Sequence, residues 1–149
     1  MLMLWCCSRE YIRYALGRED MDVPSPTYLL HNTYSQMPGS VDIHHYDLYR
    51  LQDKSEIEFA RLDLKHSLET GVCLIEWPER LIAMGMAPEE RLELYLSHTC
   101  EDRAALDDED SERIIRIRSF GERWDQLVLT LAGHVRDRGS MLGLELLAP

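Results

Sequence analysis

The chain has 149 residues, of which 45% are hydrophobic and 29% charged, so it can bury a core and does not fit a disordered or fibrous class. Sixteen basic and 27 acidic side chains give a formal charge of −11, which excludes wrapping of nucleic acid through a broad basic face. We therefore expect one folded domain over residues 1–149, with any role on RNA being indirect.

The cysteines and the N-terminus bear on the cellular compartment. Four cysteines occur without a C-x-x-C pair: Cys6, Cys7, Cys73 and Cys100. This usage favours a reducing, intracellular compartment over a disulfide framework. Residues 1–7 form an apolar, atypical N-terminus that is too short for a secretory signal core or a membrane span.

The first expected elements are a short helix and a proline-containing loop. Residues 8–17 predict a helix with Ser8 as its N-cap and Gly17 as its stop. Residues 22–28 hold two prolines in three positions, which favours an ordered loop or an extended segment. Residues 29–34 then offer possible strand material.

Two strands and a helix are expected in the middle of the chain. Residues 41–45 alternate apolar and polar side chains and predict a strand that ends in a polar cluster. A capping box predicts a helix over residues 55–66. Residues 72–75 form a short apolar run typical of a buried parallel strand, with Glu76 at its carboxyl edge and Pro78 ending it.

The last part of the chain predicts two strands and a helix. Residues 92–97 and 115–118 alternate apolar and polar side chains, and an acidic loop insert at 100–112 lies between them. Residues 122–133 have the apolar spacing of an amphipathic helix within a C-terminal helical region, 122–149. The order of these elements is that of a small α/β domain.

Glu76 is the first candidate for chemistry. A carboxylate at the carboxyl edge of a sheet lies where α/β proteins bind ligands, and in phosphoryl transfer such an acid holds or orders Mg²⁺. The alternative is a solvated loop residue or a cap.

Asp47 is the second candidate, because an acid between two aromatic rings, a histidine and an arginine can be desolvated or paired. The alternative for Asp47 is a surface pair with Arg50. Ser25 and Thr27 flank Pro26 and offer two hydroxyls to a ligand, or else belong to a turn that binds none.

Neighbouring histidines and one cysteine complete the candidates. His44 and His45 are adjacent on an expected strand and point to opposite faces, so we assign no zinc site to them. Cys73 is expected in the core. The sequence has no G-x-S-x-G and no H-E-x-x-H motif, so neither a serine hydrolase nor a zincin is supported.

Three ordered segments together resemble the TsaE family of small P-loop ATPases: Ser-Pro-Thr-Tyr at 25–28, His-Tyr-Asp-Leu-Tyr-Arg-Leu at 45–51 and Leu-Ile-Glu-Trp-Pro-Glu at 74–79. The similarity spans about residues 8–121. It implies an α/β fold, a three-layer P-loop NTPase-like sheet flanked by helices, here missing or replacing its first strand and P-loop.

The resemblance implies a role in making N6-threonylcarbamoyladenosine (t6A) on tRNA. TsaE-type proteins bind and hydrolyse ATP with Mg²⁺ while docked on a TsaD-type transferase, with TsaB as a third partner in bacteria, and are thought to reset that complex. The tRNA is contacted only indirectly, and no membrane is involved. The compartment would be the cytoplasm in a bacterium and a mitochondrion or plastid in a eukaryote.

The resemblance also implies roles for five residues. Glu76 would be the Mg²⁺-associated acid at the end of a Walker-B-like strand, and Asp47 the acid needed for hydrolysis. Thr27 would be a switch-like threonine near the γ-phosphate, Trp77 would pack beside the nucleotide, and Arg113 would approach it.

One family motif is missing. TsaE proteins carry Gly-x-x-Gly-x-Gly-Lys-[Thr/Ser] directly before the helix represented here by residues 8–17. The only lysines of this chain are Lys54 and Lys65, and its first glycine is Gly17. Losing several charge-assisted hydrogen bonds of roughly 1.5–3 kcal/mol each predicts ATP binding weaker by orders of magnitude. We therefore expect little or no ATPase activity.

Several hypotheses follow from this departure. The chain is a truncated gene model or alternative transcript of a TsaE-type ATPase, or it is a non-catalytic scaffold that docks on the TsaD-type partner without nucleotide. A third hypothesis sets the resemblance aside and makes Asp47 and Glu76 a metal-carboxylate pair in another hydrolysis. Residues 2–7 could form a stand-in strand that fills part of the nucleotide cleft.

Overall fold

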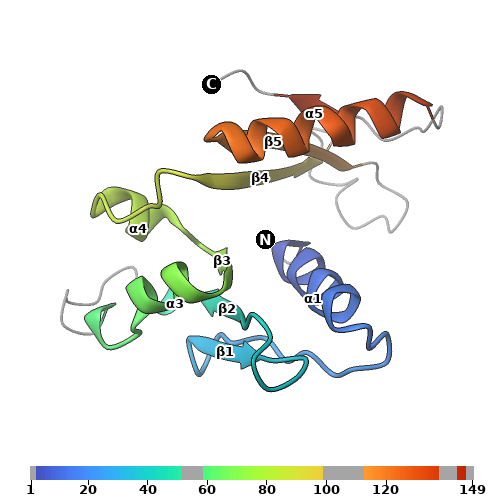
Figure 1. The fold of residues 1–149 in the computed structure, drawn as a ribbon. Helices are drawn as coiled ribbons and strands as arrows, with labels where there is room; N and C mark the ends of the chain where they lie inside the picture. The colour runs from blue at the N-terminus through green and yellow to red at the C-terminus, as the bar shows by residue number, and fades with distance from the viewer. Residues whose placement is uncertain (1–2, 52–58, 99–112, 138–143, 147–149) are drawn as a thin grey trace. The chain divides into compact units, whose positions relative to one another are not determined.

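A computed structural model describes residues 3–51, 59–98, 113–137 and 144–146 (Figure 1). The chain divides into two compact units, residues 1–87 and 88–149, and each is described by itself. The expectation of one domain over residues 1–149 stays a prediction. The acidic loop insert at 100–112 and the capping box at 55–58 lie outside the described residues.

The first unit is a three-stranded mixed sheet with its helices. In chain order its elements are α1 (Met3–Leu16), β1 (His31–Tyr34), β2 (Ile43–Asp47), the 3-10 helix η1 (Tyr49–Leu51), α3 (Leu64–Thr70), β3 (Val72–Glu76) and α4 (Glu79–Ala83). The strand order is β1-β2-β3, with β1 antiparallel and β3 parallel to β2. The central strand is therefore β2, all five of whose residues are buried.

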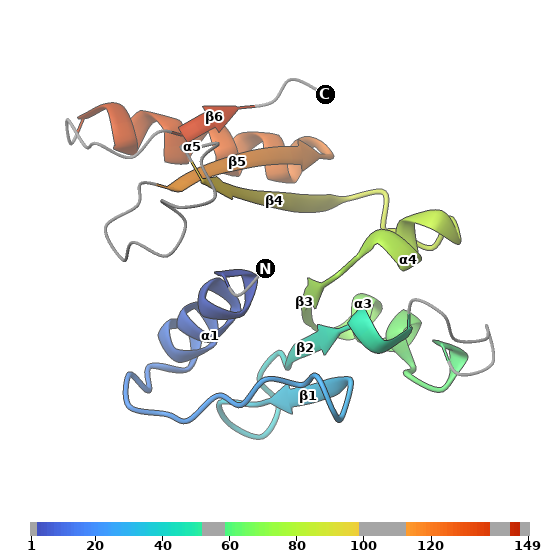
Figure 2. The ribbon, with the colours of Figure 1, turned by 180° about the vertical axis from the view of Figure 1, so that it is seen from behind.

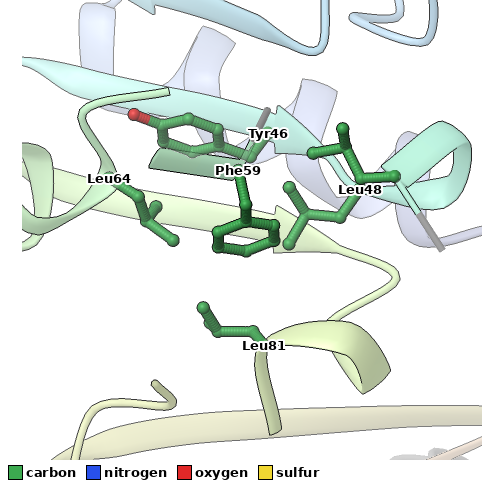
Figure 3. Close-up of a cluster of buried hydrophobic side chains, with 6 residues drawn as sticks. Tyr46, Leu48, Phe59, Leu64 and Leu81 are labelled. Atoms are coloured by element: carbon green, nitrogen blue, oxygen red, sulfur yellow. The ribbon is translucent and has the colours of Figure 1, made fainter. Parts of the chain in front are cut away.

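Alternation along β2 separates two apolar clusters. Ile43 packs with Ile12 and Leu16 of α1, so α1 covers that face of the sheet. Tyr46 points to the opposite face, because its Cβ alternates with that of Ile43 along the strand. There it packs in the cluster shown in Figure 3, which contains Tyr46, Leu48, Leu51, Phe59, Leu64 and Leu81. Helices thus cover both faces of this sheet.

The second unit is a smaller sheet with one long helix. Its elements are β4 (Arg91–His98), β5 (Arg113–Phe120), α5 (Glu122–Asp137) and β6 (Leu144–Leu146) (Figure 2). The strands β4 and β5 pair antiparallel over eight residue pairs, and β6 pairs parallel to β5 after the crossover through α5. Among the described residues of this unit, the buried apolar side chains are Ile117 and Val128.

Much of the predicted secondary structure is confirmed. The strands at 72–75, 92–97 and 115–118 appear as β3, β4 and β5, and β3 is parallel to its neighbour as expected. The strand expected at 41–45 is found two residues later, as β2 over Ile43–Asp47, and Val41 is exposed outside it. The helix over 122–133 appears as α5. The 29–34 segment is strand only from His31. The strand β6 within the expected helical region 122–149 was not predicted.

The N-terminal helix differs from the prediction. It begins at Met3, so Ser8 is a buried residue inside α1 and not its N-cap. Residues 3–7 are helical, and a stand-in strand over 2–7 is therefore wrong. The stop at Gly17 is confirmed: its φ is +64°, and its N–H bonds to the carbonyl of Tyr14 at 3.1 Å, as expected of a helix-ending glycine.

The single helix over 55–66 is wrong in its second half. Asp63 has a left-handed φ of 47° and is the N-cap of a separate helix, α3, which begins at Leu64. An α-helix cannot continue through that conformation. The capping pattern alone did not reveal this interruption.

The mixed α/β class is confirmed, whereas the described strands form two three-stranded sheets. No described helix is long and apolar enough to cross a membrane.

Candidate functional site

Two carboxylates lie side by side where β2 and β3 end. Asp47 is the last residue of β2, Glu76 is the last residue of β3, and the two are partners in the parallel register. Neighbouring strands are about 4.8 Å apart, and both side chains face the α1 side of the sheet. Asp47 is 4% and Glu76 5% exposed. Two buried neighbouring acids are costly unless each has hydrogen-bond partners.

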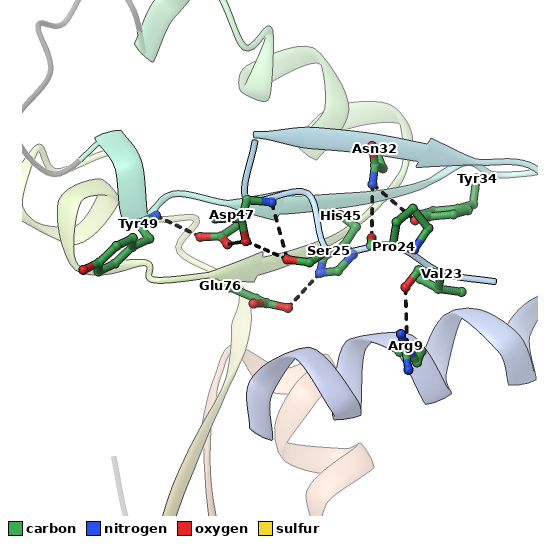
Figure 4. Close-up of polar contacts among 11 residues, drawn as sticks. Arg9, Val23, Pro24, Ser25, Asn32, Tyr34, His45, Asp47, Tyr49 and Glu76 are labelled. Carbon is green, nitrogen blue, oxygen red and sulfur yellow. Dashed lines mark hydrogen bonds and ion pairs between the residues drawn. The ribbon is translucent and has the colours of Figure 1, made fainter. Parts of the chain in front are cut away.

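Glu76 is paired with His45. The Nε2 atom of His45 lies 2.8 Å from Oε1 of Glu76, and the imidazole is fully buried (Figure 4). Nδ1 of His45 is buried and has no hydrogen-bond partner among the described residues. The pair is consistent with a ring that carries its proton on Nε2 and donates it to the carboxylate. Glu76 is therefore not the solvated loop residue of the alternative hypothesis.

Asp47 is held by the proline-containing loop and by the backbone of η1. The hydroxyl of Thr27 donates to Oδ2 of Asp47 at 2.7 Å. The N–H of Tyr49 donates to Oδ1 of Asp47 at 3.0 Å (Figure 4). Ser25 Oγ lies 2.6 Å from Thr27 Oγ1 and completes a chain of hydroxyls that ends on the carboxylate. Asp47 thus accepts two hydrogen bonds, and the 25–27 turn is oriented by the acid.

The surface pair between Asp47 and Arg50 is wrong. The guanidinium of Arg50 lies over the ring of Tyr28, 4.7 Å from its centroid, and Asp47 is buried among other partners. Tyr28, which follows the Ser-Pro-Thr segment, therefore contacts Arg50, the last residue of the His-Tyr-Asp-Leu-Tyr-Arg segment.

The loop that carries Thr27 is fixed at both sides of Pro24. The carbonyl of Val23 accepts from Nε of Arg9 in α1 at 3.3 Å, and that of Pro24 accepts from the Asn32 amide at 3.3 Å (Figure 4). Val23 is fully buried. These contacts position the loop that carries the Thr27 hydroxyl.

Two strained backbone positions border the carboxylates. Leu30 and Trp77 have φ values of 66° and 60°, which side chains other than glycine rarely adopt. The carbonyl of Leu30 accepts the N–H of Asp47 at 3.1 Å. Trp77 directly follows Glu76, and its ring is tilted against Tyr49 at 5.0 Å. Strain of this kind concentrates at functional sites.

Asp47 and Glu76 carry the kind of oxygen atom that binds Mg²⁺, whereas the described residues near Ser8 lack the groups that bind phosphate. Mg²⁺ binds through one or two carboxylates and keeps several waters, and each carboxylate has lone pairs beyond those its partners use. No group of three or more His, Cys, Asp and Glu side chains is placed to hold a metal ion within the described ranges. A magnesium ion here would depend on oxygens from a ligand or water.

The residues around Ser8 do not form a phosphate cradle. Because α1 begins at Met3, the N–H of Ser8 lies beyond the first four residues of the helix and is used inside it. Lys65 is an exposed residue of α3. Among the described residues, then, two buried acids lie at the carboxyl ends of β2 and β3, and no ring of free N–H groups with a lysine is found beside them.

Four of the predicted site residues come together: Thr27, Asp47, Glu76 and Trp77. Arg113 begins β5 in the second unit, so its approach to a nucleotide stays a prediction. Sequence reasoning missed the role of His45, although its position two residues before Asp47 places both side chains on one face of a strand.

A mixed sheet with helices on both faces defines an α/β protein, the class in which ligands bind beyond the carboxyl ends of the strands, where Asp47 and Glu76 lie. The family model "Threonylcarbamoyl adenosine biosynthesis protein TsaE" matches residues 8–105. The chain belongs to the TsaE family.

Three bacterial proteins, each described as tRNA threonylcarbamoyladenosine biosynthesis protein TsaE, are similar to this chain. That of Bacillus subtilis is 30% identical over 112 residues, covering 75% of this chain and 61% of the relative. That of Rickettsia conorii is 42% identical over 71 residues, covering 48% and 38%. That of Haemophilus influenzae is 42% identical over 69 residues, covering 46% and 40%. The chain thus spans 38–61% of the length of these relatives.

Proposed function

We propose that this protein acts in t6A biosynthesis as a TsaE-type component that docks on a TsaD-type transferase, with TsaB as a third partner in bacteria. The single observation that supports it best is the in-register Asp47–Glu76 pair, with Thr27 hydrogen-bonded to Asp47. All three come from the segments shared with the family. The strong negative charge supports indirect contact with tRNA, through a partner that binds it.

In this proposal the site takes ATP with Mg²⁺. Glu76 holds the magnesium ion, whose chemistry is to neutralise charge on the phosphates. Asp47 is the acid needed for hydrolysis. Because Thr27 is hydrogen-bonded to Asp47, a ligand that binds Asp47 also affects the loop that carries Thr27. Trp77 packs beside the nucleotide and Arg113 approaches it. His45 orients the carboxylate of Glu76 through their buried hydrogen bond.

We further propose that the 149-residue chain binds ATP weakly and has little ATPase activity. It contains no Gly-Lys-[Ser/Thr] sequence, and α1 uses the N–H of Ser8 internally. Without a lysine and a ring of free N–H groups, the phosphates lose their main partners. Docking without nucleotide, as a scaffold, is the second candidate, which the missing phosphate cradle favours.

Calorimetric titration of the chain with ATP and Mg²⁺ tests the nucleotide part. We expect no binding in the micromolar range. Micromolar binding that is weakened in Asp47→Asn and Glu76→Gln, and retained in the exposed-acid control Glu79→Gln, would overturn the proposed deficiency and support a working site. Mg²⁺ binding without nucleotide that these two variants abolish would favour the metal-carboxylate hypothesis.

A pull-down with a purified TsaD-type transferase tests the partner. We expect capture of the chain in the absence of ATP, and equal capture of the Glu79→Gln control. Failure to bind the transferase with and without nucleotide would contradict both the ATPase component and the scaffold.

A further inference from the structure

A second polar cluster lies on the face of the first sheet opposite to the carboxylates. It consists of His31 and Thr33 on β1 and His44 on β2. Nε2 of His31 lies 3.1 Å from Nδ1 of His44, and Oγ1 of Thr33 lies 3.1 Å from the first nitrogen and 3.2 Å from the second. Two nitrogens and one oxygen thus form a nearly equilateral triangle.

Packing around the cluster fixes both imidazole rings. The ring of His31 stacks on Tyr46 with centroids 4.1 Å apart and planes 2° apart. Tyr46 is itself anchored by its hydroxyl, 2.8 Å from Ser67 Oγ. The ring of His44 lies flush against Gly71, where a Cβ would be 2.6 Å from Cδ2. Groups outside the cluster therefore hold both rings in place.

The geometry points to a metal site. In tetrahedral zinc sites the metal–nitrogen distance of about 2.0–2.1 Å separates two ligand nitrogens by roughly 3.3 Å, close to the 3.1 Å seen here. We propose that His31 Nε2 and His44 Nδ1 bind a zinc-like divalent cation, with the Thr33 hydroxyl at a third corner and water completing the coordination. Imidazole nitrogens suit zinc, copper and nickel.

Solvent access decides whether an ion can reach the cluster. Thr33 is exposed and His31 is half-buried, so an ion can enter from solvent.

The site differs from the one that sequence reasoning rejected. Adjacent histidines on one strand cannot share an ion, but His44 meets His31 across the antiparallel pair β1–β2. Since no larger His, Cys, Asp and Glu group is found in the part of the chain that the structure describes, two imidazoles are its protein nitrogen ligands. A hydrogen-bonded histidine pair without metal affinity is the competing explanation.

Zn²⁺ titration of the full chain, in competition with a chromophoric chelator, tests the proposal. We expect micromolar affinity for the wild type and a loss of at least about tenfold in His31→Gln and in His44→Gln. His98→Gln, which removes a histidine from β4, is the matched control and should leave the affinity unchanged. Circular dichroism of each variant checks that it folds.

Long-range ¹H–¹⁵N NMR of the imidazoles gives a readout that does not depend on variants. We expect Zn²⁺ to bring His31 Nε2 and His44 Nδ1 to the ¹⁵N shift of metal-bound nitrogens, with the proton fixed on the other nitrogen of each ring. Millimolar affinity, unchanged affinity in both folded variants, or coordination through the other ring nitrogens would overturn the proposal and leave a hydrogen-bonded pair.

Discussion

Two neighbouring histidines of β2 lie on opposite faces of the strand and have different partners. His45 is fully buried on the α1 side and pairs with a carboxylate. His44, one residue earlier, faces the other side and pairs with a second imidazole from β1. The residue type is the same, and the difference comes from the strand that each ring faces. A single strand thereby supplies two separate polar clusters.

The two clusters should also differ in how much they contribute to the stability of the chain. On the α1 side, burial of Glu76 and Asp47 makes every hydrogen bond to them important, because an unsatisfied buried carboxylate is costly. On the other side, exposure of Thr33 and half-burial of His31 let water replace lost contacts. Variants of the carboxylate cluster should therefore destabilise the chain more than variants of the histidine cluster.

The largest effect is expected for Glu76→Leu. It removes the acceptor of His45, whose Nδ1 already has no partner, and should lower the free energy of unfolding by about 3 kcal/mol. Glu76→Gln keeps an acceptor oxygen and should cost less than about 1 kcal/mol. Urea denaturation measures both. Equal losses in the two variants would show that the His45 hydrogen bond does not matter.

Thr27→Val should have the next largest effect. It removes the hydroxyl that donates to Asp47 at 2.7 Å, and a hydrogen bond to a carboxylate contributes about 1.5 kcal/mol. Ser25→Ala is the control, since Ser25 is exposed and reaches the acid only through Thr27. A Ser25→Ala loss as large as that of Thr27→Val, in the same urea experiment, would contradict the direct role of Thr27.

Tyr46→Phe tests the support of the histidine cluster. It keeps the ring that stacks on His31 and removes the hydroxyl bonded to the buried Ser67, at an expected cost of about 1 kcal/mol in thermal or urea unfolding. Tyr14→Phe is the matched control, because Tyr14 is 87% exposed. A Tyr46→Phe variant as stable as this control would mean that the hydroxyl anchor contributes nothing.

The smallest effect concerns pH. Because burial lowers the pKa of His31 and His44 from 6.5, the unfolded state binds more protons than the folded state in that range. Their stabilisation is complete above pH 6.5 and is lost as pH falls from 6.5 through the lowered pKa values. Tm measured from pH 7.5 to about 5 should fall less steeply in His31→Gln/His44→Gln. If Tm fell with pH as steeply in this double variant as in the wild type, the prediction would be contradicted.

Local patterns in the sequence predicted most strands and the chemistry of the acids. The alternation of apolar and polar side chains predicted β4, β5 and the approximate place of β2, and a continuous apolar run predicted β3, because both patterns depend on neighbours along the chain. The acid after 72–75 could be placed at a strand's carboxyl edge for the same reason. The break at Asp63 could not, since a left-handed residue ends a helix that the capping pattern alone would continue. The start of α1 at Met3 was not predicted either.

By itself, the sequence determined the mixed α/β class, the acids of the site and membership of the TsaE family, because side-chain periodicity and ordered motifs are properties of the chain. Only the tertiary structure decided which groups meet. Asp47 and Glu76 are 29 residues apart and become register partners through strand pairing. Thr27 contacts Asp47, and His31 contacts His44, although no rule of spacing along the sequence would pair them. Pairing between strands, not position along them, sets these contacts.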